Sequence, residues 1–430
     1  MEIRPRNSLN ALVTLPGSKS ITNRALLLAV LGDGPTTLDG FLDAEDTRIM
    51  LNALRTLGLD VLHDPSNKRV EVVGHRGIFP VRNEEIYVAN SGTSARFLTA
   101  ALAFADGDYR LYGKPRMHER PIRDLVDALR QLGAEILCEN GNDCPPVKIS
   151  GRRKEHPASN REATVSGSMS SQFLSALLMV APLASKQGAV DIRLIGTLVS
   201  VPYVEMTLAM IRAFGVDVVT SDDFSSFHFG RNSMYKSPPE YRIEPDASAA
   251  SYFFAAAAVC GGTVCVPGLS RQSLQGDIAF VDCLEQMGCA VVFGADSISV
   301  SRSSDRPLRG ISVDMNLFSD TAQTLAAVAL FADGPTDIRN IEHVRFKETD
   351  RIAATATELR KFGAVVDERS DGLTIVPPNQ LLSAVVETYD DHRMAMSFAV
   401  TGLRQPGVVI RNPGCVEKTF PEFFAEFDKL

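Results

Sequence analysis

The segment Leu15-Pro16-Gly17-Ser18-Lys19-Ser20-Ile21-Thr22-Asn23-Arg24 places a turn, a helix start and two cationic side chains within ten residues. Pro16-Gly17 ends an extended run, a serine of the segment can cap a helix, and the helix continues until Gly32-Asp33-Gly34-Pro35 stops it. A strand, a turn and a helix N-terminus direct backbone N–H groups and the positive end of the helix dipole at one point. The segment therefore predicts an anion-binding helix start to which Lys19 and Arg24 add charge. An ordinary capped helix with both side chains solvated gives the same pattern.

Composition narrows the class of protein. The 430 residues, 45% of them hydrophobic and 22% charged, predict a soluble globular chain of two or three domains. A net charge of −8 argues against a general affinity for nucleic acid or acidic membranes, so a cationic site must be local and its substrate small. The seven cysteines include no C-x-x-C spacing and histidine is sparse, which predicts neither a metal site nor a disulfide framework. The only early apolar run is too short for a membrane span, and we expect a cytoplasmic protein.

One pattern recurs along the chain: an amphipathic helix, a bulky apolar residue followed by glycine, and then a β-branched run. Its copies end at Leu57-Gly58, Leu132-Gly133, Phe214-Gly215, Met287-Gly288 and Phe362-Gly363. Each glycine stands where a helix C-cap requires positive φ. The glycines are 73 to 82 residues apart, so the unit is far longer than a solenoid repeat, and six units fit the chain.

Each unit also contains an earlier helix rich in small and apolar residues, followed by a strand-like run. These helices are expected over residues 21–31, 94–104, 171–181, 249–259, 321–331 and 394–403. Because they are apolar almost all round, we expect them to be buried. The polar stretch over 222–240 ends in Pro238-Pro239 and is the best candidate boundary, with three units on each side. The sequence thus predicts an α/β chain with two similar domains.

Polar residues and cations gather at the starts of the apolar helices. The caps alone account for Ser, Thr, Asp and Asn at these positions, but not for the cations. Those cations are Arg96, Arg120, Arg351, Arg393 and Lys418. Lys347, Glu348 and Arg351 are spaced so that they share one helix face, although a surface ion-pair face has a similar spacing. The set predicts a site for two anions, a phosphate and a carboxylate, with one acid and one base for proton transfer.

Several long motifs, in order along the chain, resemble the 5-enolpyruvylshikimate-3-phosphate synthase family of enolpyruvyl transferases. They are Leu15 to Ser20 with Asn23-Arg24, Asn90-Ser91-Gly92-Thr93 with Arg96, Pro115-Arg116-Met117 with Glu119-Arg120-Pro121-Ile122, Gly167 to Phe173, Lys347 to Arg351, Asp391-His392-Arg393-Met394-Ala395-Met396, and Lys418-Thr419-Phe420-Pro421. The resemblance runs nearly end to end.

The resemblance implies an inside-out, barrel-like fold of two domains, each built from three βαβαββ repeats with buried parallel helices. One domain would span 18–240 and the other 1–17 with 241–430. It also implies a transferase of the shikimate pathway, which supplies aromatic amino-acid biosynthesis. The enolpyruvyl group of phosphoenolpyruvate would pass to the 5-hydroxyl of shikimate 3-phosphate through a tetrahedral adduct, with release of phosphate. No metal or organic cofactor and a monomeric chain are implied.

By the same resemblance, specific residues acquire expected roles. Shikimate 3-phosphate would be held by Lys19, Ser20, Arg24, Ser170, Ser171, Gln172, Ser200, Asp320 and Lys347. Phosphoenolpyruvate would be held by Lys19, Gly92, Arg120, Gln172, Arg351, Arg393 and Lys418. Asp320 would take the 5-hydroxyl proton and Glu348 would serve the methylene carbon, with Lys19 assisting. Because the cations are divided between the two halves, we also expect shikimate 3-phosphate to compact the protein.

Two departures and two rival functions stay open. His343 stands where many relatives carry Asn, so no ligand role is assigned to it. In the loop that begins at Asn90, many relatives carry Ala and Pro where this chain has Ser91 and Phe97, whereas Gly92 is unchanged. The first rival is enolpyruvyl transfer to UDP-N-acetylglucosamine. An enzyme with that activity is expected to carry a reactive cysteine in a loop, and this chain has no Cys in a comparable loop. The second is a non-catalytic anion-binding relative, against which the retention of both Asp320 and Glu348 argues.

Overall fold

The computed structural model describes residues 1–151 and 161–430. By internal contacts the chain divides into two compact units. The N-terminal unit comprises Gly17–Ile243, and the C-terminal unit comprises Met1–Pro16 together with Glu244–Leu430. The chain therefore passes between units after Pro16 and again after Ile243. The sequence-based boundaries were placed after residues 17 and 240.

The N-terminal unit contains three four-stranded sheets with one shared topology. In order across each sheet, the strands are β13 (Glu240–Arg242), β2 (Pro35–Asp39), β4 (Arg69–Val73) and β3 (Val61–Asp64); β5 (Asn83–Tyr87), β6 (Asp108–Tyr112), β8 (Val147–Ser150) and β7 (Glu135–Cys138); and β9 (Glu162–Ser166), β10 (Val190–Ile195), β12 (Ser226–Phe229) and β11 (Val219–Thr220). In each sheet the first pair is parallel and the next two pairs are antiparallel.

The C-terminal unit repeats this topology in two of its sheets. The strands are β1 (Leu9–Leu12), β14 (Gly262–Pro267), β16 (Ser297–Arg302) and β15 (Ala290–Phe293), and then β18 (Ser312–Asp314), β20 (Thr336–Arg339), β22 (Gly372–Val376) and β21 (Val365–Arg369). A parallel pair of β23 (Val385–Val386) and β24 (Val409–Ile410) takes the place of the third sheet. A second short parallel pair joins β17 (Leu308–Arg309) to β19 (Ala332–Asp333).

Two helices accompany each sheet and complete the repeat. Between β5 and β8, for example, the order is β5, α3 (Gly92–Leu102), β6, α4 (Arg123–Gln131), β7 and β8, which is the predicted βαβαββ unit. The five glycines expected at helix C-termini, Gly58, Gly133, Gly215, Gly288 and Gly363, all have positive φ between 78° and 106°. The predicted fold class is therefore confirmed.

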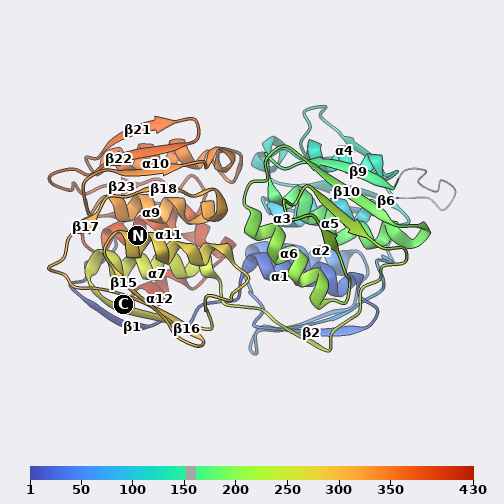
Figure 1. Ribbon diagram of the computed structural model, residues 1–430, viewed down its shortest axis with the longest axis horizontal. Helices are drawn as coiled ribbons and strands as arrows, with labels where there is room; N and C mark the ends of the chain where they lie inside the picture. Colours follow the sequence, from blue (N-terminus) through green and yellow to red (C-terminus); the bar gives the residue numbers. More distant parts are fainter. Residues whose placement is uncertain (152–160) are drawn as a thin grey trace. The chain divides into compact units, whose positions relative to one another are not determined.

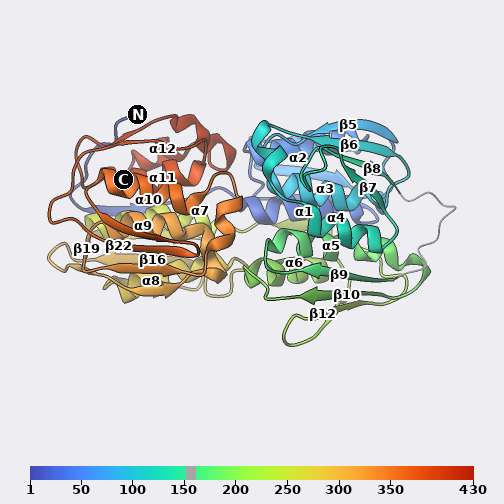
Figure 2. The same cartoon turned by 90° about the horizontal axis from the view of Figure 1, so that it is seen from above.

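The apolar helices form the interior of each unit. They are α1 (Lys19–Leu31), α3 and α5 (Ser171–Ala184) in the N-terminal unit, and α7 (Ala247–Cys260), α9 (Ala322–Ala329) and α11 (His392–Gly402) in the C-terminal unit. Every residue of α3, α7, α9 and α11 is buried. Figures 1 and 2 show α7, α9 and α11 side by side, with sheets outside them. Because these helices start at the same end of each unit, their first residues gather there.

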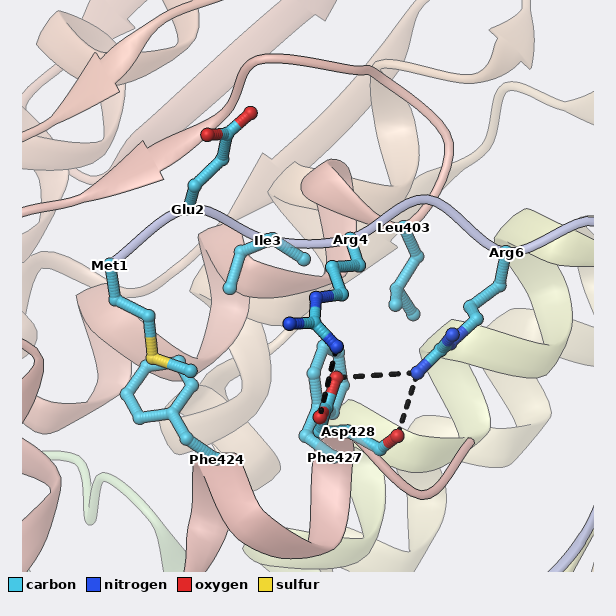
Figure 3. A pocket seen from close by; sticks show the side chains of 9 residues that line it. All are labelled: Met1, Glu2, Ile3, Arg4, Arg6, Leu403, Phe424, Phe427 and Asp428. Atoms are coloured by element: carbon cyan, nitrogen blue, oxygen red, sulfur yellow. Dashed lines mark hydrogen bonds and ion pairs between the residues drawn. The ribbon is translucent and has the colours of Figure 1, made fainter.

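The remaining helices lie farther from each core. They are α2 (Glu45–Thr56), α4 (Arg123–Gln131), α6 (Val201–Ala213), α8 (Phe280–Gln286), α10 (Arg351–Lys361) and α12 (Phe423–Phe427). The N-terminal segment joins α12, because Arg6 donates to the backbone oxygen of Asp428 at 2.6 Å. A small pocket lies between the two segments (Figure 3), floored by Ile3, Leu403 and Phe427. In the described part of the chain, no helix combines the length and the apolar character that crossing a membrane requires.

Candidate active site

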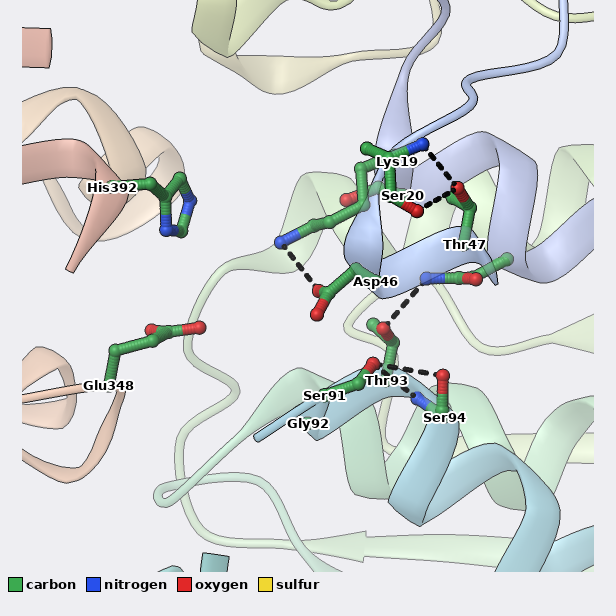
Figure 4. A network of polar contacts seen from close by, with 12 residues as sticks. Lys19, Ser20, Asp46, Thr47, Ser91, Gly92, Thr93, Ser94, Glu348 and His392 are labelled. Atoms are coloured by element: carbon green, nitrogen blue, oxygen red, sulfur yellow. Dashed lines mark hydrogen bonds and ion pairs between the residues drawn. The ribbon is translucent and has the colours of Figure 1, made fainter. Parts of the chain in front are cut away.

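At the start of α1 a lysine is directed by a buried carboxylate. Ser18 caps the helix by accepting a hydrogen bond from the Ile21 N–H, which leaves Lys19 as the first helical residue. The Lys19 ammonium lies 3.7 Å from a carboxylate oxygen of Asp46, whose side chain is 2% exposed (Figure 4). Asp46 stands in the first turn of α2 and was not among the predicted residues. It lies 27 positions after Lys19 in the sequence, so no local spacing pointed to it.

The start of α3 is hydrogen-bonded to α1, and the guanidinium of Arg120 lies against it. Asn23 donates to the Thr93 hydroxyl at 2.9 Å, and Ser91 caps α3 (Figure 4). Arg120 donates to the backbone oxygen and the side-chain oxygen of Asn90, at 2.9 and 3.1 Å. A methyl group built on Gly92 would lie 2.5 Å from the Arg120 Nη2 atom. The guanidinium therefore needs the bare backbone of Gly92.

Arg24 is enclosed rather than solvated. It is 1% exposed, donates to the Thr207 hydroxyl at 2.7 Å and the Ser175 hydroxyl at 3.1 Å, and also reaches the Ser20 backbone oxygen at 3.1 Å. Its guanidinium also lies over the rings of Phe97 and Tyr203, at 5.3 and 5.9 Å. Burial lowers the pKa of Arg24 to about 10, so the side chain stays charged at neutral pH. The interpretation of Arg24 as a solvated surface cation is therefore wrong.

Of the predicted serines, Ser20 is the second residue of α1, and the other three lie at the starts of α5 and α6. Ser170 caps α5 by accepting a hydrogen bond from the Gln172 N–H at 3.2 Å, and Ser171 is the first residue of the helix. Ser200 precedes α6 in the left-handed region, at φ 54°, and is 4% exposed. Arg96 differs from these residues, because it donates to the Pro121 backbone oxygen at 2.8 Å and lies over the Phe173 ring. Arg96 therefore has a structural role.

In the C-terminal unit, one carboxylate is surrounded by cations. Asp320, in the 3-10 helix η4 (Asn316–Thr321) directly before α9, lies 2.6 Å from the Lys347 ammonium, 2.6 Å from Arg393 and 3.2 Å from Arg351. Its side chain is 13% exposed, so the group is shielded without being closed off. Asp320, Lys347 and Arg351 come from one repeat, and Arg393 comes from the next. The helix starts of the unit place them together.

Arg351 links a second and a third carboxylate to this group. It lies 2.8 Å from Glu348 and 2.7 Å from Asp391, and its own side chain is 2% exposed. The interpretation of 347–351 as a surface ion-pair face is therefore wrong. Lys418, in the 3-10 helix η6 (Pro413–Lys418), is 6% exposed and lies on an element packed against α11. Asp391 caps α11 and was quoted in a motif without a role.

Burial and charge act in opposite directions on the cations. Burial lowers the pKa of the Lys347 ammonium, although Asp320 works against that shift. Burial also favours the neutral form of Arg351, but the carboxylates of Asp391, Glu348 and Asp320 outweigh it and raise the pKa of that guanidinium. His343 forms a 2.8 Å hydrogen bond with the Ser319 hydroxyl. Burial and then Lys347 lower its pKa to about 3, so His343 is neutral near pH 7.

Comparison of the sequence with known proteins shows the family of the chain. The family model for EPSP synthase (3-phosphoshikimate 1-carboxyvinyltransferase) matches residues 3–427. The 3-phosphoshikimate 1-carboxyvinyltransferase of Serratia proteamaculans is 48% identical over 431 residues, which cover 100% of this chain and 98% of the relative. The chloroplastic 3-phosphoshikimate 1-carboxyvinyltransferase of Arabidopsis thaliana is 47% identical over 440 residues, covering 100% of this chain and 84% of that protein.

Solved structures agree with the sequence comparisons. EPSP synthase from Acinetobacter baumannii superposes with a TM-score of 0.79 at 26% identity, covering 100% of this chain and 97% of that one. The enolpyruvyl transferase NikO from Streptomyces tendae shares the fold, with a TM-score of 0.74 at 18% identity and coverage of 100% and 96%. With a family model matched over nearly its whole length, the chain belongs to the EPSP synthase family.

Proposed function

We propose that the chain transfers the enolpyruvyl group of phosphoenolpyruvate to the 5-hydroxyl of shikimate 3-phosphate, with release of phosphate. The observation that carries the proposal is Asp320, which lies 2.6 Å from Lys347 and 2.6 Å from Arg393. A carboxylate can accept a hydroxyl proton only if it stays ionised, and adjacent cations keep it so. The same cations are the groups that recognise phosphate and carboxylate.

The reaction assigns a separate task to each carboxylate. The 5-hydroxyl oxygen bonds to the central carbon of phosphoenolpyruvate, and its proton passes to Asp320. The methylene carbon gains a proton from Glu348 and becomes a methyl group in the tetrahedral adduct, while Lys19 assists. Phosphate then leaves with its bonding electron pair, and a methyl proton returns to Glu348, which restores the double bond. Fixed cations stabilise the charge that moves onto the phosphate.

The substrate contacts are assigned by residue and stay proposals. Shikimate 3-phosphate is held by the hydroxyl and cationic groups at the helix starts: Lys19, Ser20, Arg24, Ser170, Ser171, Gln172, Ser200, Asp320 and Lys347. Phosphoenolpyruvate is held by Lys19, Gly92, Arg120, Gln172, Arg351, Arg393 and Lys418. Arg120 supports this division, because its guanidinium is fixed by Asn90 against the bare backbone of Gly92. A fixed guanidinium loses little freedom when it binds a carboxylate or a phosphate.

The test is phosphate release from phosphoenolpyruvate with one acceptor at a time. We expect release with shikimate 3-phosphate and none above background with UDP-N-acetylglucosamine or without an acceptor. Release only with the nucleotide sugar would overturn the assignment. Release with neither acceptor, in a sample that binds shikimate 3-phosphate, would favour the non-catalytic alternative.

Location and assembly are also proposed. The chain is a cytoplasmic monomer, which is consistent with the net charge of −8 and with seven cysteines that form no disulfide in the described residues. Light scattering coupled to gel filtration tests the monomer, for which a mass near 46.6 kDa is expected. A mass twice that value at micromolar protein would refute it.

A further inference from the structure

A buried carboxyl group, Asp277, lies behind the proposed ligands of phosphoenolpyruvate. Asp277 belongs to the 3-10 helix η3 (Gly276–Ala279) and is 4% exposed. The Ser248 hydroxyl donates a hydrogen bond to its Oδ2 atom. The same hydroxyl oxygen accepts from the Arg393 guanidinium at 3.4 Å. Ser248 therefore bridges Asp277 and Arg393.

The bridge and Asp320 contact the same terminal nitrogen of Arg393. The nitrogen that reaches Ser248 also donates to Asp320 at 2.6 Å, and the other terminal nitrogen lies 3.4 Å from the Tyr252 hydroxyl. Arg393 is thus oriented by Ser248 and Tyr252 on α7 and by Asp320 in η4, and η3 acts on it through Ser248. A guanidinium fixed at several nitrogens presents its remaining N–H groups in one direction.

The segment that carries Asp277 is itself anchored. The side-chain oxygen of Gln275 accepts from the Ala247 N–H at 3.0 Å, and its side-chain nitrogen donates to the Pro245 backbone oxygen at 2.7 Å. Gln275 is 6% exposed. Because Gln275 binds the segment before η3 to the start of α7, two residues ahead of Asp277, a change at Asp277 alters Ser248 and Arg393 rather than being absorbed by movement of that segment.

Asp277 also changes charge in an accessible pH range. Burial, followed by repulsion from Asp320 and with a smaller contribution from Asp246, raises its pKa to about 6, while Arg393 and the Ser248 hydrogen bond work against the rise. Lys347, which directly follows η5 (Glu342–Phe346), and Arg351, the first residue of α10, also contact Asp320. Below this pH the group behind Arg393 is neutral, and above it the group is an anion.

We propose that Asp277 is a positioning residue for Arg393: through Ser248 it fixes the guanidinium, and its charge sets how strongly Arg393 attracts phosphoenolpyruvate. This inference rests on the proposed function. An ionised Asp277 competes with the incoming anion for the charge of Arg393. The affinity for phosphoenolpyruvate therefore falls as Asp277 ionises, by roughly three- to thirtyfold for a unit charge a few ångströms beyond the guanidinium.

The experiment compares Asp277→Asn and Ser248→Ala with the wild-type chain between pH 5.5 and 8.5. Asn keeps the size and the acceptor of Asp277 but cannot ionise. The KM for phosphoenolpyruvate depends on pH in two ways: Asp277 ionises near pH 6 and raises KM, and the phosphate of the substrate titrates as well. We expect Asp277→Asn to remove only the first contribution, because the second is common to both proteins. The KM for shikimate 3-phosphate should stay within about twofold. Ser248→Ala should raise the KM for phosphoenolpyruvate at every pH.

Controls separate positioning from general damage. Asp124→Asn, on α4 in the N-terminal unit, removes another carboxyl group whose pKa burial raises, and it should leave the pH profile unchanged. The KM of the double variant of Asp277 and Ser248 should differ from the product of the single effects, because both act through one bridge. If Asp277→Asn does not fold, Ser248→Ala alone decides the matter.

The outcomes also distinguish this inference from the proposed function. Calorimetric titration of phosphoenolpyruvate in the presence of shikimate 3-phosphate gives the same pH comparison without turnover. No turnover by the wild-type chain would refute the proposed function. The calorimetric comparison would still test whether Asp277 affects the affinity for phosphoenolpyruvate. Superimposable pH profiles for wild type and Asp277→Asn would overturn the inference. An equal loss in kcat and in both KM values at every pH would overturn it too, because that result means a merely structural role.

Discussion

Replacing Gly92 with alanine tests the contact between the start of α3 and Arg120. The new Cβ would lie 2.5 Å from Arg120 Nη2, 3.0 Å from Arg120 Cζ and 3.1 Å from Arg96 Nη1. Cβ atoms essentially never lie within 3.0 Å of a neighbour and ordinarily lie beyond 3.4 Å, so Arg120 must move at that nitrogen by at least about 0.5 Å, and by about 0.9 Å for an ordinary contact. Asn90 holds the same guanidinium at 2.9 and 3.1 Å, so the movement also breaks or lengthens these hydrogen bonds.

The size of the effect follows from the bond that is lost. A hydrogen bond to a charged group contributes about 1.5–3 kcal/mol, which corresponds to a rise in KM for phosphoenolpyruvate of about tenfold to a hundredfold. A shift of about 1 Å near the reacting atoms also lowers kcat. The fold should not suffer, because Gly92 is the first residue of α3 and alanine favours a helix by up to about 1 kcal/mol.

The assay is steady-state phosphate release with each substrate varied in turn, beside the melting temperature. The KM for shikimate 3-phosphate should change by less than about twofold. Gly230→Ala is the matched control, because a methyl group there meets nothing closer than 4.0 Å. A Gly92→Ala protein whose KM for phosphoenolpyruvate lies within twofold of wild type would refute the role given to Arg120.

Three further predictions follow from the C-terminal unit and from the ligand assignments. Asp320→Asn and Glu348→Gln should each lower turnover by about 10²–10⁴ while shikimate 3-phosphate, titrated calorimetrically, binds within about an order of magnitude of wild type; near-normal turnover in both would show that the acid and base are misassigned. His343 has its pKa lowered to about 3 in the folded chain, so the unfolded chain gains a proton below about pH 6.5 that the folded chain does not, and stability is lost as pH falls. His343→Gln should therefore lose about 2 kcal/mol less than wild type between pH 7 and 5 in urea unfolding, and equal losses would contradict the burial argument. Saturating shikimate 3-phosphate should lower the radius of gyration in small-angle scattering, and an unchanged radius in a sample that binds the ligand would exclude closure.

Much of the fold was predictable because the repeat is long and a glycine marks the end of a helix at regular intervals. The glycines at 58, 133, 215, 288 and 363 mark helix ends in the sequence and adopt the expected positive φ in the structure. The apolar helices were recognisable because they carry small apolar residues all round, as in α7, where every residue is buried. Short-range spacing also predicted the contact of Glu348 with Arg351, since three residues separate neighbours on a helix face.

Long-range partners were not predictable from spacing. Asp46 approaches Lys19 from another helix, and Ser248 joins Asp277 to Arg393 across three elements. No periodicity relates such residues, because the distances between repeats are set by packing. Burial was equally hidden: Arg24 occupies a helix start that suits a solvated cation, yet it is 1% exposed between two aromatic rings.

The charges of the C-terminal unit give the chemistry a direction. Lys347, Arg351 and Arg393 lie within ion-pair distance of three carboxylates, Asp320, Glu348 and Asp391. With all three carboxylates ionised these charges balance, so Glu348 must be protonated before it can donate to the methylene carbon, and its protonation leaves a net positive charge for the phosphate. When Asp320 takes the hydroxyl proton it loses its charge, and Lys347 and Arg393 become available to the phosphate at that moment. Proton transfer and stabilisation of the leaving phosphate are thus coupled through one carboxylate, and the cations favour the transition state over the bound substrate.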